Sequence, residues 1–321
     1  MKQILILSIC IASFHNSYCW GFYAHRQINH YAVFLLPPEM LVLYKPHIDF
    51  LSSHAVDPDK RRYAVAEEGP RHYIDLDHYG SFPYNGLPRK WTEAVEKYTR
   101  DTLMIYGIAP WWIQTMLGRL TNAFQVKDQS RILKLSAEIG HYLGDIHVPL
   151  HASSNHNGQH TGQHGIHGFW ESRIPELLAA SEWDFFIGGA EYIDNPLSFA
   201  WQRIFESAAA SDTVLRYERK LNDQFPTDQK YAFEERNGIL VRQYSTAYSM
   251  AYNNMLNNMV ERRMRQSIFA VASFWYTAWI NAGQPDLKEL SSRELTAADQ
   301  KEFDELNAQW KAGSLKGKDC E

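Results

Sequence analysis

Five residues in the middle of the chain have the types and the spacing of metal ligands. His141 and Asp145 are four residues apart, and so are His167 and Glu171. On a helix, side chains four residues apart project from the same face one turn apart, so one ion can take both. His151 follows shortly after a proline, which should end the first helix and turn the chain back beside its last turn. Because zinc takes imidazole nitrogens and carboxylate oxygens, these residues indicate a multinuclear zinc site.

Other interpretations of this stretch remain open. Residues 141 to 171 hold seven of the 14 histidines of the chain, so the stretch could also serve as a zinc reservoir. A single histidine and acid at helical spacing is more often a surface hydrogen bond than a ligand pair. We expect His147 to be a bystander, and we expect the other three histidines to be solvated loop side chains: His156, His160 and His164.

The segments that must position these residues are predicted to be helices joined by long loops. Residues 131 to 145 carry apolar side chains at helical spacing, and residues 240 to 281 form two long amphipathic stretches. Segments 69 to 90 and 152 to 166 are rich in Gly, Pro, Asn or His and are expected to be loops. Few segments alternate with period two, and no internal repeat is evident. The sequence therefore predicts a mostly α-helical single domain.

The first residues resemble a secretory signal peptide. Lys2 precedes an apolar run of about eleven residues, and Ser17 and Cys19 stand at positions suited to cleavage before Trp20. The run is shorter than the roughly 20 residues that span a bilayer, so no transmembrane helix is expected after cleavage. An uncleaved anchor and a lipoprotein modified at Cys19 are the alternatives. The expected division is a signal peptide at 1–19, a domain at 20–290 and a charged C-terminal tail at 291–321 with a final surface helix. The protein would be secreted or periplasmic.

Composition limits the possible partners and cross-links. The chain has 321 residues, 45% hydrophobic and 21% charged, which is long enough to bury a core without disulfides. Loss of Lys2 with the signal changes the formal charge from −5 to −6, which argues weakly against a non-specific nucleic-acid binder. Of three cysteines, only Cys320 would remain, so no intrachain disulfide could form. No obligate protein partner is evident.

Nine positions together resemble the zinc-dependent phospholipase C and S1/P1 nuclease superfamily. The motifs follow the order of that family over about residues 20 to 180: WGFYAH, HAVDPDK, RHYID, HYLGDIHVPLH and HGFWE. The resemblance implies a compact all-helical domain with three zinc ions in a cleft. The ligands that it implies are Trp20, His25, Asp57, His72, His141, Asp145, His151, His167 and Glu171.

The resemblance also implies how the ligands are shared. Asp57, His72, His141 and Asp145 would hold one zinc ion, and His151, His167 and Glu171 a second. The third would be held by His25 and the amine and carbonyl of Trp20, with Asp145 as the expected bridge. Because that amine binds zinc only as a free N-terminus, cleavage of the signal peptide would complete the site.

The expected reaction is hydrolysis of a phosphodiester, because closely spaced zinc ions make hydroxide available near neutral pH. Asp57 could orient or deprotonate the attacking water. Lys60 is predicted to stabilise charge at the phosphate, and a solvated lysine is the alternative.

The substrate class stays open between two expectations. The spacing from Trp20 to His25 resembles the nucleases, as does the HYID segment, where Tyr73 and Asp75 would grip a nucleobase. The HYLGD motif, Glu171 and the short segment before His167 are similar to the phospholipases, which we slightly favour. Pro58 replaces the aromatic residue of choline-binding relatives, which argues against a choline preference. A non-catalytic zinc-binding protein is the third possibility.

Overall fold

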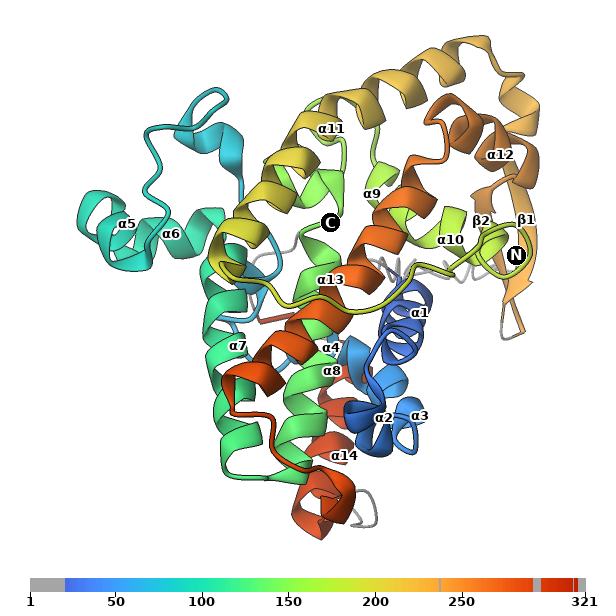
Figure 1. Cartoon of the computed structure of the whole chain (residues 1–321). Coiled ribbons are helices and arrows are strands. Elements are labelled where there is room, and N and C mark those ends of the chain that lie inside the picture. The colour runs from blue at the N-terminus through green and yellow to red at the C-terminus, as the bar shows by residue number, and fades with distance from the viewer. Residues whose placement is uncertain (1–20, 237, 291–295, 314, 317–321) are drawn as a thin grey trace, which may run out of the picture.

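The structure is a computed structural model that describes residues 21–236, 238–290, 296–313 and 315–316. The predicted signal peptide, Trp20 and Cys320 lie outside these residues. The described chain is mostly helical, which confirms the all-α prediction for the body of the domain (Figure 1). The principal α-helices are α1 (Phe22–Val33), α2 (Pro38–Tyr44), α3 (Ile48–Ser53), α4 (Asp57–Arg61), α5 (Trp91–Tyr98), α6 (Arg100–Tyr106), α7 (Ala109–Gln125), α8 (Gln129–Asp145), α9 (Ile166–Gly168), α10 (Ile174–Leu178), α11 (Pro196–Gln224), α12 (Thr246–Met255), α13 (Met259–Asn281) and α14 (Ala297–Lys311).

Helix α8 is the central element of the core. Asp128 caps its first turn by accepting a hydrogen bond from the Arg131 backbone, and all of its residues from 136 to 145 are buried. Helices α1, α7 and α13 pack around it. Trp275 of α13 donates its indole N–H to the Ser136 carbonyl at 2.9 Å, so a buried hydrogen bond as well as apolar packing sets the position of α13. The predicted helix at 131 to 145 is confirmed, including its end near Ile146.

The short turns around α8 provide the remaining site residues. They are η1 (His54–Val56), η2 (Gly69–Arg71), η3 (Leu76–Tyr79), η4 (Pro149–Ala152) and the π-helical turn η5 (Phe169–Arg173). Two further turns, η6 (Thr227–Gln229) and η7 (Lys288–Leu290), lie away from them in the sequence. As expected, segment 69 to 90 contains no α-helix, and the predicted loop at 152 to 166 is free of α-helix except at Ile166, where α9 begins.

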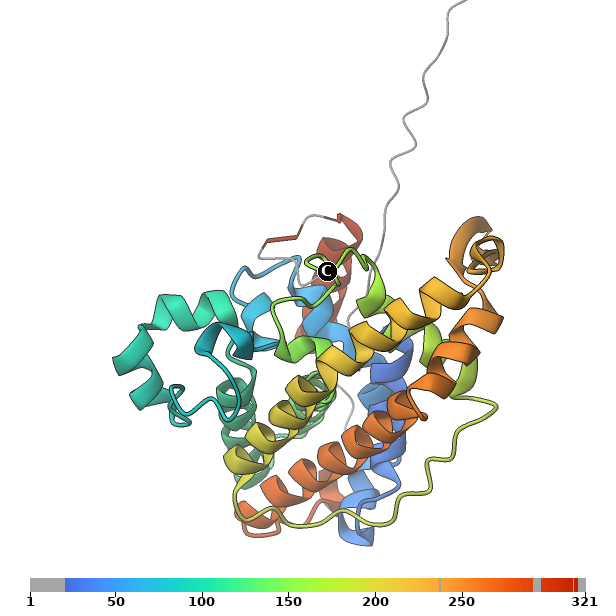
Figure 2. The same ribbon diagram turned by 90° about the horizontal axis from the view of Figure 1, so that it is seen from above.

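One part of the helical prediction is wrong. Residues 240 to 244 belong to strand β2 (Ile239–Tyr244), which pairs antiparallel with β1 (Tyr231–Arg236) from Tyr231 opposite Tyr244 to Arg236 opposite Ile239. Strand β2 is rich in β-branched and aromatic residues, β1 carries two aromatic residues, and the sequence between them is Asn-Gly, the pair that best suits a tight hairpin turn. This hairpin and the α5–α6 segment project from opposite sides of the body (Figures 1 and 2).

The segment expected to be a charged tail contains a helix that packs on the body. Thr296 and Asp299 form a capping box at the start of α14, and Phe303 is buried against the rings of Phe50 and His54. The final surface helix was therefore predicted correctly, and in the structure it covers α4. Within the described residues, no helix has the length and apolarity needed to cross a membrane.

Candidate metal centre

Helices α1 and α8 bring three of the predicted ligands together. His25 comes from α1, and His141 and Asp145 come from successive turns of α8. The His25 and His141 rings stack with centroids 3.8 Å apart, and His25 Nε2 lies 3.4 Å from Asp145 Oδ1. A side chain at Gly144 would press on the His25 ring, since a Cβ there would lie 3.1 Å from two of its atoms. A glycine at this position therefore lets α1 approach α8 closely.

A loop segment adds His72 to this group. Its Nδ1 lies 3.0 Å from Asp145 Oδ2 and 3.0 Å from His141 Nε2. Its other nitrogen, Nε2, lies 3.6 Å from an oxygen of Glu68. Glu68 is fully buried and is also bonded to Arg71 and Tyr142. Carboxylates of this kind fix the ring orientation and tautomer of metal-binding histidines. Glu68 is a site residue that the sequence reasoning missed.

The segments after α8 form a second group from the other three predicted ligands. Turn η4 begins at a proline and carries His151, whereas His167 and Glu171 come from α9 and η5. His167 Nε2 lies 2.9 Å from Glu171 Oε2 and 3.0 Å from His151 Nε2. The π-helical turn at η5 is a local distortion of a kind that often occurs at functional sites.

Asp145 joins the two groups. Its Oδ2 lies 3.0 Å from His72 Nδ1 and 3.3 Å from His141 Nε2, while its Oδ1 lies 3.4 Å from His25 Nε2 and 3.8 Å from His151 Nδ1, on the edge of the second group. Burial by itself would raise the pKa of Asp145, but the neighbouring His141 and His151 hold it well below the usual range. The carboxylate is therefore anionic and faces imidazoles on both sides.

Hydrogen bonds to carbonyls indicate which ring nitrogen carries the hydrogen in two of the histidines, His141 and His151. His141 Nδ1 is 2.8 Å from the Ala55 carbonyl and His151 Nδ1 is 2.7 Å from the His72 carbonyl, and a carbonyl can only accept. Each Nδ1 therefore carries the proton, and in the neutral ring each Nε2 presents a lone pair to the centre. His151 Nε2 and His167 Nε2 approach to 3.0 Å, and a cation beside them could take a lone pair from each ring. The donor set thus fits one or more zinc ions.

The structure differs from the prediction at Asp57. Asp59, rather than Asp57, lies near the centre, with Oδ1 3.5 Å from His141 Nε2 and 3.8 Å from His72 Nδ1. Asp57 accepts from Lys60 Nζ at 3.0 Å and contacts His54 Nδ1 at 2.6 Å. Residues two apart on a helix point in nearly opposite directions, so only one of the two acids in α4 can face α8.

Asp59 also has the environment of a metal ligand. Both of its carboxylate oxygens, and both ring nitrogens of His25, are buried without a hydrogen bond of normal geometry in the described part of the chain. Burial by itself would raise the pKa of Asp59, yet His141 and His72 lower it. An anionic, buried carboxylate with no donor is costly unless a cation compensates it. The DPD sequence could have suggested Asp59, but not which acid faces inward.

Lys60, Tyr73 and Asp75 do not take the places expected for substrate contacts. Lys60 shares the helix face of Asp57 and points toward α14, with Nζ 5.9 Å from the Trp310 ring. Tyr73 is buried, and its hydroxyl donates to the Ile105 carbonyl at 3.2 Å. The Asp75 side chain is also buried, at 1% exposure. Neither residue of the expected base-gripping pair presents a surface to a nucleobase in this structure.

The other histidines fall outside the centre. His147 is fully buried and its Nδ1 donates to the Leu143 carbonyl at 2.7 Å, so it is a core residue. His160 and His164 are exposed, as expected of loop side chains, and His156 is partly buried.

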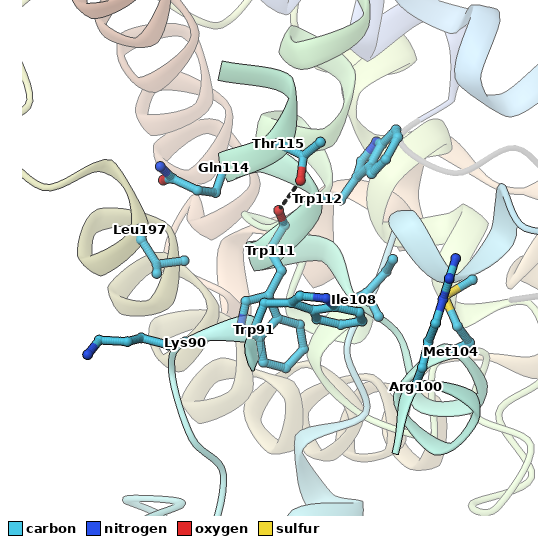
Figure 3. A pocket seen from close by; sticks show the side chains of 10 residues that line it. All are labelled: Lys90, Trp91, Arg100, Met104, Ile108, Trp111, Trp112, Gln114, Thr115 and Leu197. Carbon is cyan, nitrogen blue, oxygen red and sulfur yellow. Dashed lines mark hydrogen bonds between the residues drawn. The ribbon is translucent and has the colours of Figure 1, made fainter. Parts of the chain in front are cut away.

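A separate pocket of about 460 Å³ lies beside α7 (Figure 3). It is lined by Trp91, Trp111, Trp112 and their neighbours and includes none of the residues grouped around the candidate metal centre.

No protein-family model matches the chain, and no curated protein matches it. The functional assignment therefore rests on the candidate metal centre itself.

Proposed function

We propose that the protein is an exported zinc-dependent hydrolase of phosphoric ester bonds, of the phospholipase C and S1/P1 nuclease type. The observation that carries the proposal is the position of Asp145, whose two oxygens face two adjoining groups of imidazoles. A carboxylate placed in this way can bridge metal ions, and multinuclear zinc sites favour phosphodiester chemistry. A single structural zinc ion would need only four ligands.

The proposed ligand set changes the predicted one at a single position. Asp59 replaces Asp57 because its carboxylate faces His72 and His141. The Trp20 amine is retained from the family resemblance. The full proposed set for three zinc ions is Trp20, His25, Asp59, His72, His141, Asp145, His151, His167 and Glu171.

The chain itself supplies orientation and charge. The carbonyls of Ala55 and His72 fix the rings of His141 and His151, and the Glu68 carboxylate, 3.6 Å from His72 Nε2, favours a proton on that nitrogen. The carboxylates of Asp59 and Asp145 offset the positive charge of the ions. Zinc supplies the Lewis acidity that stabilises charge on the phosphate oxygens and makes hydroxide available near neutral pH. Asp57 and Lys60 are assigned to packing beneath α14, because their charges neutralise each other at 3.0 Å.

A phospholipid-type phosphodiester is the first choice of substrate. The burial of Tyr73 and Asp75 argues against the base grip, which is one of the two features behind the nuclease expectation; the Trp20 to His25 spacing is the other. Cleavage of single-stranded nucleic acid or 3′-nucleotides remains the alternative, and metal storage without catalysis is the alternative from another class.

The deciding experiment uses the mature protein beginning at Trp20. Its zinc content is measured, and hydrolysis of a phosphatidylcholine-type substrate, single-stranded DNA and RNA is assayed in parallel, with and without chelator. About three zinc ions and chelator-sensitive cleavage of one substrate class would support the proposal. Tight zinc binding without hydrolysis of any phosphodiester would indicate the storage alternative.

Two variants test the assembly of the centre. Asp145→Asn should lose zinc and activity together, because one bridging charge serves both groups. One extra residue before Trp20 should lower the zinc content, and a variant that retained full zinc and activity would contradict both the N-terminal ligand and the requirement for signal cleavage.

A further inference from the structure

A second pocket, of about 500 Å³, is lined by residues of α4, α7, α8 and α14 and by Arg71 of η2. We call it the basic pocket, and its lining residues are Arg61, Arg71, Trp112, Arg119, Arg131, Lys134, Leu135, Glu138 and Glu302. None of them belongs to the groups around the candidate metal centre. The buried side chain of Glu68 lies between the two sites, since it contacts both Arg71 and His72.

The lining has an excess of positive charge in a chain that is negative overall. Four arginines and one lysine face two glutamates, whereas the whole chain has a formal charge of −5. Concave sites lined by one sign of charge raise the local concentration of ions of the opposite sign. The basic pocket is therefore suited to an anion that carries more than one negative charge.

Some of these cations are already neutralised, and others are not. Arg61 bonds to Glu138, and Lys134 bonds to Glu302. Arg119 and Arg131, in contrast, have no carboxylate partner among the residues that the structure describes. Their planar guanidinium groups match the geometry of phosphate oxygens and can bind them through two hydrogen bonds at once.

Trp112 holds two of the arginines in place. The guanidinium carbons of Arg71 and Arg119 lie 4.0 and 4.9 Å from the centroid of its ring. Cation–π contacts of this kind restrict the rotamers of long side chains before a ligand arrives, which lowers the entropy cost of binding. The indole Nε1 of Trp112 is buried and has no acceptor in the described chain.

We propose that the basic pocket binds a multiply charged phosphate group, as in a phosphomonoester or a diphosphate, at a site distinct from the metal centre. Arg119 and Arg131 supply the unpaired charge, and Arg71 and Trp112 form the wall. The proposal does not depend on zinc binding or hydrolysis, because none of these residues belongs to the candidate metal centre.

The test is a titration of the zinc-loaded protein with inorganic pyrophosphate, followed by tryptophan fluorescence and calorimetry. The variant Arg119→Ala/Arg131→Ala is compared with Arg216→Ala/Arg262→Ala, which removes two exposed arginines outside the pocket. The metal centre is the same in both variants, so a difference between them reports the pocket. We expect the pocket variant to bind at least tenfold more weakly and the control to bind like the wild type.

Two further arms define the site and the source of the phosphate. Trp112→Phe should abolish the fluorescence change while the calorimetric signal from the remaining cations persists. Binding to phosphatidylcholine vesicles with and without phosphatidic acid distinguishes a lipid headgroup from a soluble phosphate. Binding of phosphatidic acid or of pyrophosphate that is lost in the pocket variant would support the proposal. Equal pyrophosphate affinity of the pocket and control variants, or the same fluorescence change without Trp112, would overturn it.

Discussion

The substitution Gly140→Ala tests the contact that brings the ligands of α1 and α8 together. Gly140 lies in α8 one residue before His141, and a Cβ there would lie 2.8 Å from Asn29 Cγ and 3.0 Å from Asn29 Nδ2. Asn29 is fully buried in α1 and donates to the carbonyls of Leu51 and Ala137 at 3.0 Å each. The new methyl group therefore has to displace a side chain that makes two buried hydrogen bonds.

The magnitude follows from those two bonds. Loss of two buried hydrogen bonds, with their carbonyls left unsatisfied, costs about 3 kcal/mol. Replacement of a helical glycine by alanine offsets this by about 1 kcal/mol. The expected net loss is about 2 kcal/mol in the free energy of unfolding, equivalent to a fall of about 4 °C in Tm for a chain of this size. Because α1 carries His25, zinc affinity should fall as well.

The assay is urea and thermal unfolding at one fixed zinc concentration, since bound metal stabilises the folded state. Gly118→Ala is the matched control, because Gly118 is an exposed residue of α7 and a Cβ there meets nothing within 4 Å. We expect this control to raise stability by up to about 1 kcal/mol and to leave zinc content unchanged.

The double variant Asn29→Ala/Gly140→Ala decides whether the mechanism is correct. Without the asparagine side chain the new methyl group has no clash, so Gly140→Ala should then stabilise the protein by about 1 kcal/mol rather than destabilise it. Two results would contradict this mechanism. Gly140→Ala could change the free energy of unfolding equally with and without Asn29, or the Gly140→Ala variant could be as stable as the Gly118→Ala control.

Three further predictions concern the acids of the site. Asp59→Asn should lower the zinc content measured by elemental analysis, whereas Asp57→Asn should retain it; the reverse result would restore the predicted ligand. Glu68→Gln should weaken zinc binding about tenfold or more in a chelator competition, because His72 loses its orienting carboxylate, and unchanged affinity would count against that role. Burial by itself would raise the pKa of Glu68, but His72 and two arginines lower it from 4.5 to about 2. A lowered pKa contributes stability that is present above about pH 4.5 and is lost as the pH falls toward 2. The wild type should therefore lose more unfolding free energy than Glu68→Gln between pH 4.5 and 2, as measured by denaturant unfolding at a series of pH values. Equal losses in the two proteins would refute the lowered pKa of Glu68.

Features that depend on local geometry could be read from the sequence. The pair His141 and Asp145 is close in the structure because helical periodicity alone places residues four apart on one face. The turn that carries His151 follows from a proline that cannot continue a helix. The hairpin at 231 to 244 was also encoded locally, by an Asn-Gly pair between β-prone segments, and that signal was overlooked.

Features that depend on distant contacts could not be read in the same way. The direction in which a five-residue helix such as α4 turns its acids is set by what packs on each side, here α8 and α14. Glu68 is four residues before His72, a spacing that could have suggested the pair, but its burial and its contact with Tyr142, 74 positions along the chain, depend on the packing of α8. Nothing in its immediate neighbours in the sequence indicates that contact.

The sequence by itself determined the kinds of ligand atoms, their pairing on single helices and the helical class of the domain, because these follow from side-chain chemistry and from a repeat of 3.6 residues. Only the tertiary structure decided that Asp59 rather than Asp57 faces the centre and that five basic residues from four elements line one pocket. These arrangements depend on how helices pack against one another, and that packing is set by the shape and burial of side chains far apart in the chain.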